Sequence, residues 1–231
     1  MDKQALIDEI IKTEWPMFHN VNGDYRVSCQ ESPGTFRRMR GAQYEVWDPE
    51  VCESYLEDLQ KAAQEGRNLP REKYIHMMAT TAPVEYEYFK SDLPEISEEK
   101  KLLVQEIWSI VGAQTDKLRE EYPLIALGGR PLHAEDEFPG STSVETYQKG
   151  ELLTYSEKTL RLLLDQIKKM QEEGREYAHD VQLATVLAAG YTSLKNAEEV
   201  MLESVRRQYE KAQAEEILKN STGCPNCRPA E

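Results

Sequence analysis

The residues best suited to chemistry are polar, charged and aromatic side chains at two predicted helix–helix corners and in the loop that precedes the second corner. They are Arg40, Gln43 and Trp47 at the first corner, Gln148, Glu151 and Tyr155 at the second, and Arg130, His133, Glu145 and Tyr147 in and after the loop. Burial and charge pairing shift the pKa values of such groups into ranges that are useful for binding or proton transfer. We therefore expect a pocket for a small polar or anionic molecule between the two corners.

We expect these residues to act in two ways. The expected catalytic residues are Glu151, Tyr155, Glu145 and His133. The expected ligand-binding residues are Arg40, Gln43, Arg130, Trp47 and Tyr147, with Arg40, Arg130 and also His133 binding an anionic group. The alternative is that Arg40 and Glu151 lie on exposed faces or form a structural ion pair. His133 precedes three acidic residues, a pattern typical of a metal site or a general base. With four histidines in the chain and no H-E-x-x-H spacing, a solvated acidic loop is the favoured interpretation.

Cys224-Pro-Asn-Cys227 has the spacing of a metal-binding half-site or a redox dithiol. A structural zinc site needs four ligands, so Cys224 and Cys227 would need Cys29 with Cys52, or the tail of a second chain. The cofactor is left open: zinc or another thiolate-bound metal at the CxxC tail is one interpretation, and an inert or occasionally oxidised tail is the favoured one. Cys29 precedes a predicted helix, where it would be either a nucleophile with a depressed pKa or a small buried side chain.

The elements that must position these residues are helices, and the chain is predicted to be all-α. The predicted helices span residues 3–20 (kinked or ended near Trp15 by Pro16), 33–47, 49–65, 70 onward, 83–88, 98–122, 143–154, 157–173, 178–189 and 194–219. Residues 123–142 are predicted to be irregular. The helix at 178–189 is expected to be buried. The last helix is expected to turn Ala197, Val200, Met201, Val205 and Tyr209 inward.

An internal duplication is predicted, with an offset of 108 residues. At this offset the N-caps Asp48 and Ser156 coincide, as do Trp47 and Tyr155, and the segment Glu65–Arg67 matches 173–175. We expect a single domain over residues 1–218, with a first unit at about 1–94 and a second at about 97–218. Residues 219–231 would be a flexible tail. Two such pseudo-symmetric units would leave a groove where their corners face each other, a favoured place for a ligand pocket.

Several runs resemble a bacterial and archaeal family known as domain of unknown function 4125. These are Gly150-Glu-Leu-Leu-Thr-Tyr-Ser-Glu-Lys-Thr-Leu160, Arg130-Pro131, Glu145-Thr-Tyr147, Ser28-Cys29-Gln30 and Glu65-Gly-Arg-Asn68. The resemblance covers roughly residues 3–205 and leaves the CPNC tail outside. It implies a helical domain and no established activity.

The net charge and the apolar pattern exclude some classes of function. With 28 basic and 42 acidic residues, the formal charge is −14, which repels phosphate backbones and argues against general nucleic-acid binding. No apolar run approaches the ~20 residues of a membrane span, and the N-terminal segment has acids within its apolar pattern rather than a secretory core. We therefore expect an acidic cytoplasmic protein without membrane contact, and a homo-oligomer is compatible with the sequence.

Two functions from different classes remain open. The first is a protein that binds or modifies a small molecule between its two helical units. The second is a helical interaction module whose groove receives a partner's segment, with the CxxC tail as a metal- or redox-active clip. A convergent set of desolvated ionisable residues would favour the first, and an exposed apolar groove would favour the second. The sequence leaves open whether the protein is an enzyme.

Overall fold

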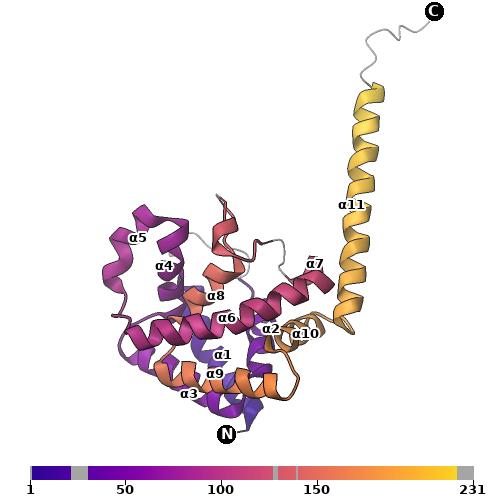
Figure 1. The fold of residues 1–231 in the computed structure, drawn as a ribbon. Helices are drawn as coiled ribbons and strands as arrows, with labels where there is room; N and C mark the ends of the chain where they lie inside the picture. Colours follow the sequence, from indigo (N-terminus) through magenta and orange to yellow (C-terminus); the bar gives the residue numbers. More distant parts are fainter. Residues whose placement is uncertain (1, 22–30, 127–129, 139, 223–231) are drawn as a thin grey trace, which may run out of the picture.

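The fold is all-α, as predicted (Figure 1). The structure is a computed structural model that describes residues 2–21, 31–126, 130–138 and 140–222, the side chains of 218–222 excepted. Within those ranges there are eleven α-helices and no strand. They are α1 (Lys3–His19), α2 (Pro33–Val46), α3 (Pro49–Gln64), α4 (Leu69–Thr81), α5 (Pro83–Phe89), α6 (Glu98–Glu121), α7 (Pro123–Ala126), α8 (Val144–Leu152), α9 (Glu157–Glu172), α10 (Tyr177–Ala188) and α11 (Leu194–Thr222).

Capping residues explain where most of these helices begin. The side chains of Ser32, Ser97, Ser143 and Ser156 each accept a hydrogen bond from the backbone N–H three residues later, which satisfies an otherwise unpaired donor. Proline occupies the first turn of α2, α3, α4 and α5, where its missing N–H costs nothing. The sequence therefore sets the boundaries of the corner helices locally.

Packing places the predicted corners at the centre of the molecule. Helix α1 packs on α3, and α6 packs on α9, while α2 packs on α10 and α4 on α8. Helices α3 and α9 also contact each other. The rings of Trp47 and Tyr155, the two corner aromatics, meet edge to face with centroids 5.9 Å apart. Both side chains are fully buried, so the corners face each other inside the core.

The arrangement is compatible with the predicted duplication, which stays a prediction. Helices α3 and α9 have 16 residues each, and both end at a glycine with positive φ, 70° at Gly66 and 72° at Gly174. The next backbone N–H, of Arg67 and of Arg175, donates in each case to a carbonyl five residues back at 2.8 Å. The packing of α2 on α10 and of α4 on α8 joins the first predicted unit to the second.

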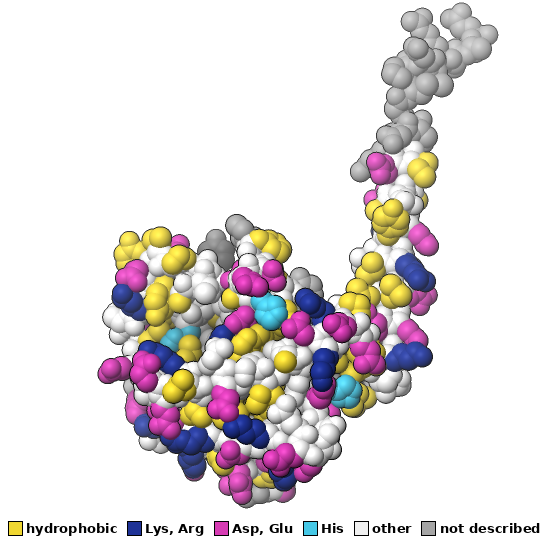
Figure 2. All heavy atoms as spheres, in the orientation of Figure 1, with side chains coloured by type: hydrophobic (Ala, Val, Ile, Leu, Met, Phe, Trp, Pro, Cys, Tyr) yellow, Lys and Arg dark blue, Asp and Glu magenta, His cyan; other side chains and the backbone are white. Residues whose placement is uncertain are grey.

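Helix α1 has nearly the predicted span and continues to His19, so Pro16 lies inside it and does not end it near Trp15. Two expectations for other helices were wrong. Helix α10 is not buried throughout, since only Tyr177 and Val186 are buried and Leu187 is 48% exposed. In α11, Ala197 faces inward, but Val200, Met201, Val205 and Tyr209 are exposed, because α11 leaves the body after its first turns (Figures 1 and 2). No helix in the described part of the chain has the length and apolar composition that a membrane crossing requires.

The predicted irregular connection is only partly irregular. It contains α7 and a 3-10 turn, Ala134–Asp136, with two further stretches outside the described residues. The backbone N–H groups of Val144 and Glu145 donate to the carbonyls of Pro131 and Leu132. The end of this connection is therefore fixed against the start of α8, which carries the second corner.

Candidate functional site

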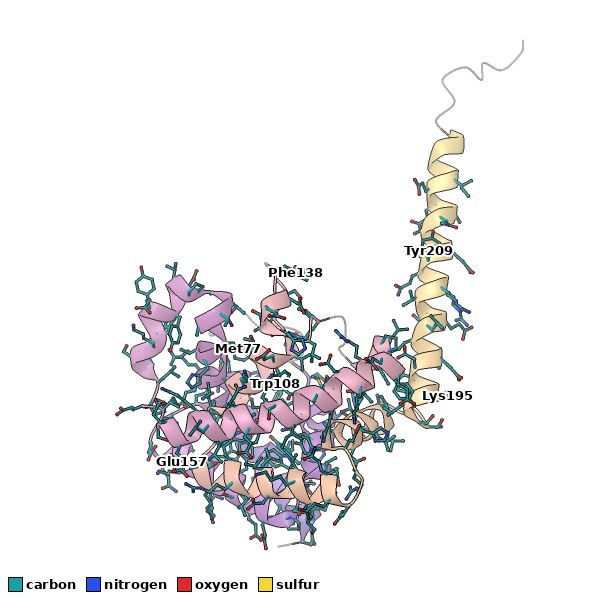
Figure 3. All side chains as sticks on the ribbon, viewed as in Figure 1. Met77, Trp108, Phe138, Glu157, Lys195 and Tyr209 are labelled. Carbon is teal, nitrogen blue, oxygen red and sulfur yellow. The ribbon has the colours of Figure 1, made fainter. Side chains whose placement is uncertain are left out.

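Two neighbouring cavities share lining residues from α2 and α8. Cavity 1 has a volume of about 520 Å³ and is lined mainly from α1, α2, α4 and α8. Cavity 2 has a volume of about 330 Å³ and is lined from α2, α6, α8, α9 and α10. Both volumes fall in the range of small-molecule sites. Met77, which is labelled in Figure 3, lies on α4 and lines cavity 1.

A network of four charged side chains lines cavity 1, and two of its members, Arg40 and Glu151, line cavity 2 as well. The Arg40 guanidinium contacts the Glu14 carboxylate through Nη2–Oε1 at 2.7 Å and Nε–Oε2 at 3.2 Å. Its Nη1 donates to Glu151 Oε1 at 2.6 Å, and Lys73 Nζ donates to Glu151 Oε2 at 2.6 Å. These side chains are only 4–15% exposed. Charges this well shielded are tolerated only when they are paired and hydrogen-bonded.

Tyrosine hydroxyls complete the network. Tyr44 donates to Glu14 Oε2 at 2.7 Å, Tyr55 to Glu14 Oε1 at 3.2 Å, and Tyr155 to Glu151 Oε1 at 2.6 Å. Burial is the main cause that raises the pKa of each of these tyrosines well above its usual range. They therefore remain protonated donors, and each carboxylate has several donors around it.

The network keeps its charges at neutral pH. Burial alone would raise the pKa of Glu151, but Arg40 and Lys73 outweigh it and hold that pKa well below its ordinary range. Burial likewise opposes the charge of Lys73, but Glu151 outweighs it, and the pKa of Lys73 is raised. Two cations and two carboxylates sum to zero. In such a buried and neutral network the charged groups are already paired with each other. The network is therefore poorly suited to release a proton.

Arg130 is the cation at this site that the network does not neutralise. It lines both cavities and is exposed to solvent. Its Nη1 donates to the carbonyl of Thr142 at 3.2 Å, and its guanidinium carbon lies 5.5 Å from the centre of the Tyr147 ring. No carboxylate among the described residues forms an ion pair with it. A guanidinium held over an aromatic ring keeps its remaining donors available for a planar anion.

The other predicted corner residues lie around this network. Gln43 accepts from Arg40 Nη1 at 3.1 Å, and Gln148 lines cavity 2. The Tyr147 ring lies 3.3 Å from Lys73 Nζ and lines both cavities. Trp47 lines neither cavity, because its indole N–H donates to the Tyr177 hydroxyl at 2.8 Å inside the core. Arg40 and Glu151 are not on exposed faces, and they form the ion pair that was the other alternative.

His133 and Glu145 belong to a separate cluster. His133 Nε2 lies 3.3 Å from Asp116, and its Nδ1 lies 3.7 Å from Glu145. Glu145 also accepts from Lys149 Nζ at 2.6 Å and from the backbone N–H of Ala134 at 3.1 Å. Burial opposes its charge, but Lys149, this N–H and His133 together lower the pKa of Glu145. Neither residue lines a cavity, so the structure does not bring them to the Arg40–Glu151 pair.

The sequence-based prediction did not include Glu14 and Lys73, which are half of the network. A signal was present in each case. Glu14 follows Ile7, Ile10 and Ile11 at helical spacing on an otherwise apolar face of α1. Lys73 lies between Leu69 and Met77 on the buried face of α4. A single charge on an apolar helical face indicates a buried partner of opposite sign.

Cys224 and Cys227, the predicted metal ligands, lie outside the described residues, and so does Cys29. Cys52 is a buried free thiol whose Sγ donates to the Tyr44 carbonyl at 3.7 Å. Burial raises its pKa to about 11, which disfavours the thiolate that a metal would need. Within the described ranges, no three His, Cys, Asp or Glu residues are grouped so that they could hold a metal ion.

The comparison with known families gives one result. The family model described as "Protein of unknown function (DUF4125)" matches residues 4–199. Neither a curated protein nor a solved structure matches the chain. Every residue that lines the two cavities lies within the matched range, whereas the projecting part of α11 begins at its end. The chain therefore belongs to the DUF4125 family.

Proposed function

We propose that this member of the DUF4125 family binds a small amphipathic anion, with an apolar body in cavity 1 and a carboxylate on Arg130. The observation that carries the proposal is the guanidinium of Arg130, which no carboxylate of the described ranges neutralises, at the edge of a cavity whose other charges are paired. Ligand sites with an apolar interior and few polar groups are the usual form of small-molecule pockets.

The electrostatics favour an anion at Arg130 rather than deeper in the cavity. Arg40 and Lys73 are matched by Glu14 and Glu151, so an anion beside them would disturb a neutral network. Arg130 carries a charge that no described carboxylate offsets. A carboxylate suits its planar donor pairs better than a spherical anion does. The head group of the ligand is therefore expected at the solvent edge.

The lining of cavity 1 favours an apolar ligand body. Phe18, Phe36, Leu69, Met77 and Met78 contribute to it. Unbranched methionine side chains adapt to ligands of varied shape. The hydroxyl groups of Tyr55, Thr81 and Thr154 already donate to protein acceptors. Few polar groups are left to bind a strongly hydrated molecule in the interior.

Binding is better supported than acid–base catalysis. A carboxylate whose pKa is strongly depressed, as that of Glu151 is, makes a weak general base. A tyrosine whose pKa is raised, as that of Tyr155 is, gives up its proton less readily. The catalytic roles of Glu151, Tyr155, Glu145 and His133 remain predictions, and so does the cytoplasmic location.

Arg130→Gln tests the proposal. Titration calorimetry with dodecanoate should show at least a tenfold loss of affinity, because a charge-assisted hydrogen bond contributes ~1.5–3 kcal/mol. Binding of dodecan-1-ol, which has no charge, should change less than twofold. Arg119→Gln removes the charge of another exposed arginine, on α6 away from both cavities, and should leave dodecanoate binding unchanged. Equal dodecanoate affinity in the Arg130 variant and the native protein would refute the proposal.

A second function is favoured by the surface of α11. Val200, Leu202, Val205, Tyr209 and Ile217 are exposed along this projecting helix (Figure 2), an unusual apolar content for an isolated helix. This supports the alternative of a helical interaction module, with a second copy of the chain as the simplest partner. Light scattering gives the mass of the native chain and of a variant that ends at Glu199, and so distinguishes a monomer from a self-associated form in each. A monomer in both cases would rule out self-association through α11.

A further inference from the structure

We propose that cavity 2 receives a second apolar branch of the same ligand, so that the preferred ligand is a carboxylic acid with two apolar branches that diverge close to the carboxyl group. This inference rests on the proposed function, because it takes the carboxylate to lie on Arg130. It assigns to the smaller cavity a role that the binding of a straight chain in cavity 1 does not require.

The two cavities share their outer edge. Arg130, Tyr147 and Met39 line both of them, and Met39 is 58% exposed. Arg40 and Glu151 also line both, but these two side chains are shielded from solvent. The Arg40–Glu151 pair therefore separates the cavities at their base, while Arg130 lies where they meet at the surface. A head group on Arg130 has access to both cavities.

The interior of cavity 2 suits an apolar group. Ile107, Val111, Val144, Leu163 and Val181 line it. The hydroxyls of two of its three tyrosines are engaged, since that of Tyr155 donates to Glu151 and that of Tyr177 accepts from Trp47, while the third, Tyr147, lies at the edge shared with cavity 1.

No charge of cavity 2 is left for a second anionic head. Its charged lining residues are Arg40 and Glu151, which are paired with each other, and Arg130 at the rim. A second charged head group would therefore be left in an apolar cavity without a counter-ion, which is unfavourable. An alkyl branch would bury apolar surface at no such cost.

The cavities are counterparts at the predicted offset of 108 residues. Among the residues that line one cavity only, four pairs of positions separated by 108 contribute one residue to cavity 1 and the other to cavity 2. They are Phe36 and Val144, Tyr55 and Leu163, Leu69 and Tyr177, and Lys73 and Val181. In the last pair a charged residue of cavity 1 corresponds to an apolar residue of cavity 2. Cavity 2 thus has the position of a second pocket that lacks Glu14 and Lys73, two of the charged groups of the first.

The test uses two isomeric probes and two variants that fill one cavity each. Dodecanoate is straight, and 2-butyloctanoate has the same formula with two branches next to its carboxyl group. Val181→Trp fills cavity 2, and Met78→Trp fills cavity 1. Calorimetry gives affinity and stoichiometry for each probe, and circular dichroism confirms that both variants are folded.

The expected pattern is specific. Val181→Trp should weaken 2-butyloctanoate at least tenfold and change dodecanoate less than twofold, whereas Met78→Trp should weaken both, and each probe should bind one per chain. An unchanged affinity of 2-butyloctanoate in the Val181 variant would overturn the inference, as would two dodecanoates per chain. Loss of both probes with Arg130→Gln, together with insensitivity to Val181→Trp, would reject the second branch and keep the proposed function. Native protein that binds neither probe would reject both.

Discussion

At the scale of single residues, the buried network is the feature with the largest energetic consequence. Taking Arg40, Glu14, Glu151 and Lys73 out of water carries a large desolvation cost, which is offset only because each charge meets an opposite one at 2.6–2.7 Å. Removing one member leaves a net charge in the core. The network therefore holds α1, α2, α4 and α8 together.

Glu151→Gln should destabilise the protein by ~3–5 kcal/mol, because Arg40 and Lys73 then lose their shared counter-ion while buried. Urea unfolding measures the change. Glu53→Gln removes an exposed carboxylate from α3 and should cost less than ~0.5 kcal/mol. Adding Lys73→Met to Glu151→Gln should recover part of the loss, since it restores neutrality. A cost below about 1 kcal/mol for Glu151→Gln would contradict this account.

His76 should make the protein sensitive to mild acid. Burial, with a smaller contribution from Lys100, lowers its pKa from 6.5 to about 4, and its Nε2 has no hydrogen-bond partner among the described residues. Since the unfolded chain binds this proton at a higher pH than the folded chain, unfolding becomes easier as pH falls from about 6.5 to about 4. His76→Gln should flatten the free energy of unfolding over that window. An unchanged pH profile in this variant would exclude His76 as the cause.

At the scale of helices, the capping residues made the helix boundaries predictable. Which neighbouring helices pack on each other could not be predicted in the same way. Ser156 with the glycine at 174 defines α9 from local chemistry alone. The burial of α10 and α11 was predicted wrongly, because periodicity shows that a helix has an apolar face but not whether a neighbour covers it. The corner residues were identified from the spacing of the two capped helix pairs. Lys73 and Glu14 lie away from these corners, and their partners Glu151 and Arg40 are distant in sequence, so these two residues were missed.

Close contact between α4 and α8 depends on Gly150. A Cβ atom at this position would lie 2.8 Å from Met77 Cγ and 3.1 Å from the Lys73 carbonyl oxygen. Gly150→Ala should therefore push the helices apart and cost ~1–3 kcal/mol. Gly41 in α2 has no atom within 4 Å of its hypothetical Cβ, so Gly41→Ala should stabilise the chain by ~0.5–1 kcal/mol. Thermal unfolding measures both, and an equal effect of the two substitutions would refute the packing argument.

At the scale of the whole molecule, helices of the first predicted unit pack against helices of the second. Helix α2 of the first packs on α10 of the second, and α4 of the first packs on α8 of the second. Each unit therefore buries part of its surface against the other. The projecting part of α11 is different, since a helix without neighbours is marginally stable in water.

A variant that ends at Glu199 should unfold in a single cooperative transition. Tryptophan fluorescence reports on the surroundings of Trp15, Trp47 and Trp108, and far-ultraviolet circular dichroism reports on all helices, so the two urea curves should coincide. The midpoint should equal that of the full chain within error, because the removed residues have few contacts with the body. Two separated transitions would show that the predicted units fold independently.

Methyl NMR of the full chain labelled at methionine tests the central claim, that a carboxylate with an apolar body binds in cavity 1. Met77 and Met78 line this cavity, while Met170 is buried elsewhere in the core and Met201 lies on α11. Saturating dodecanoate should shift the methyl signals of Met77 and Met78 and leave those of Met170 and Met201 in place. Shifts confined to Met201, or no shift at Met77 and Met78, would contradict the claim.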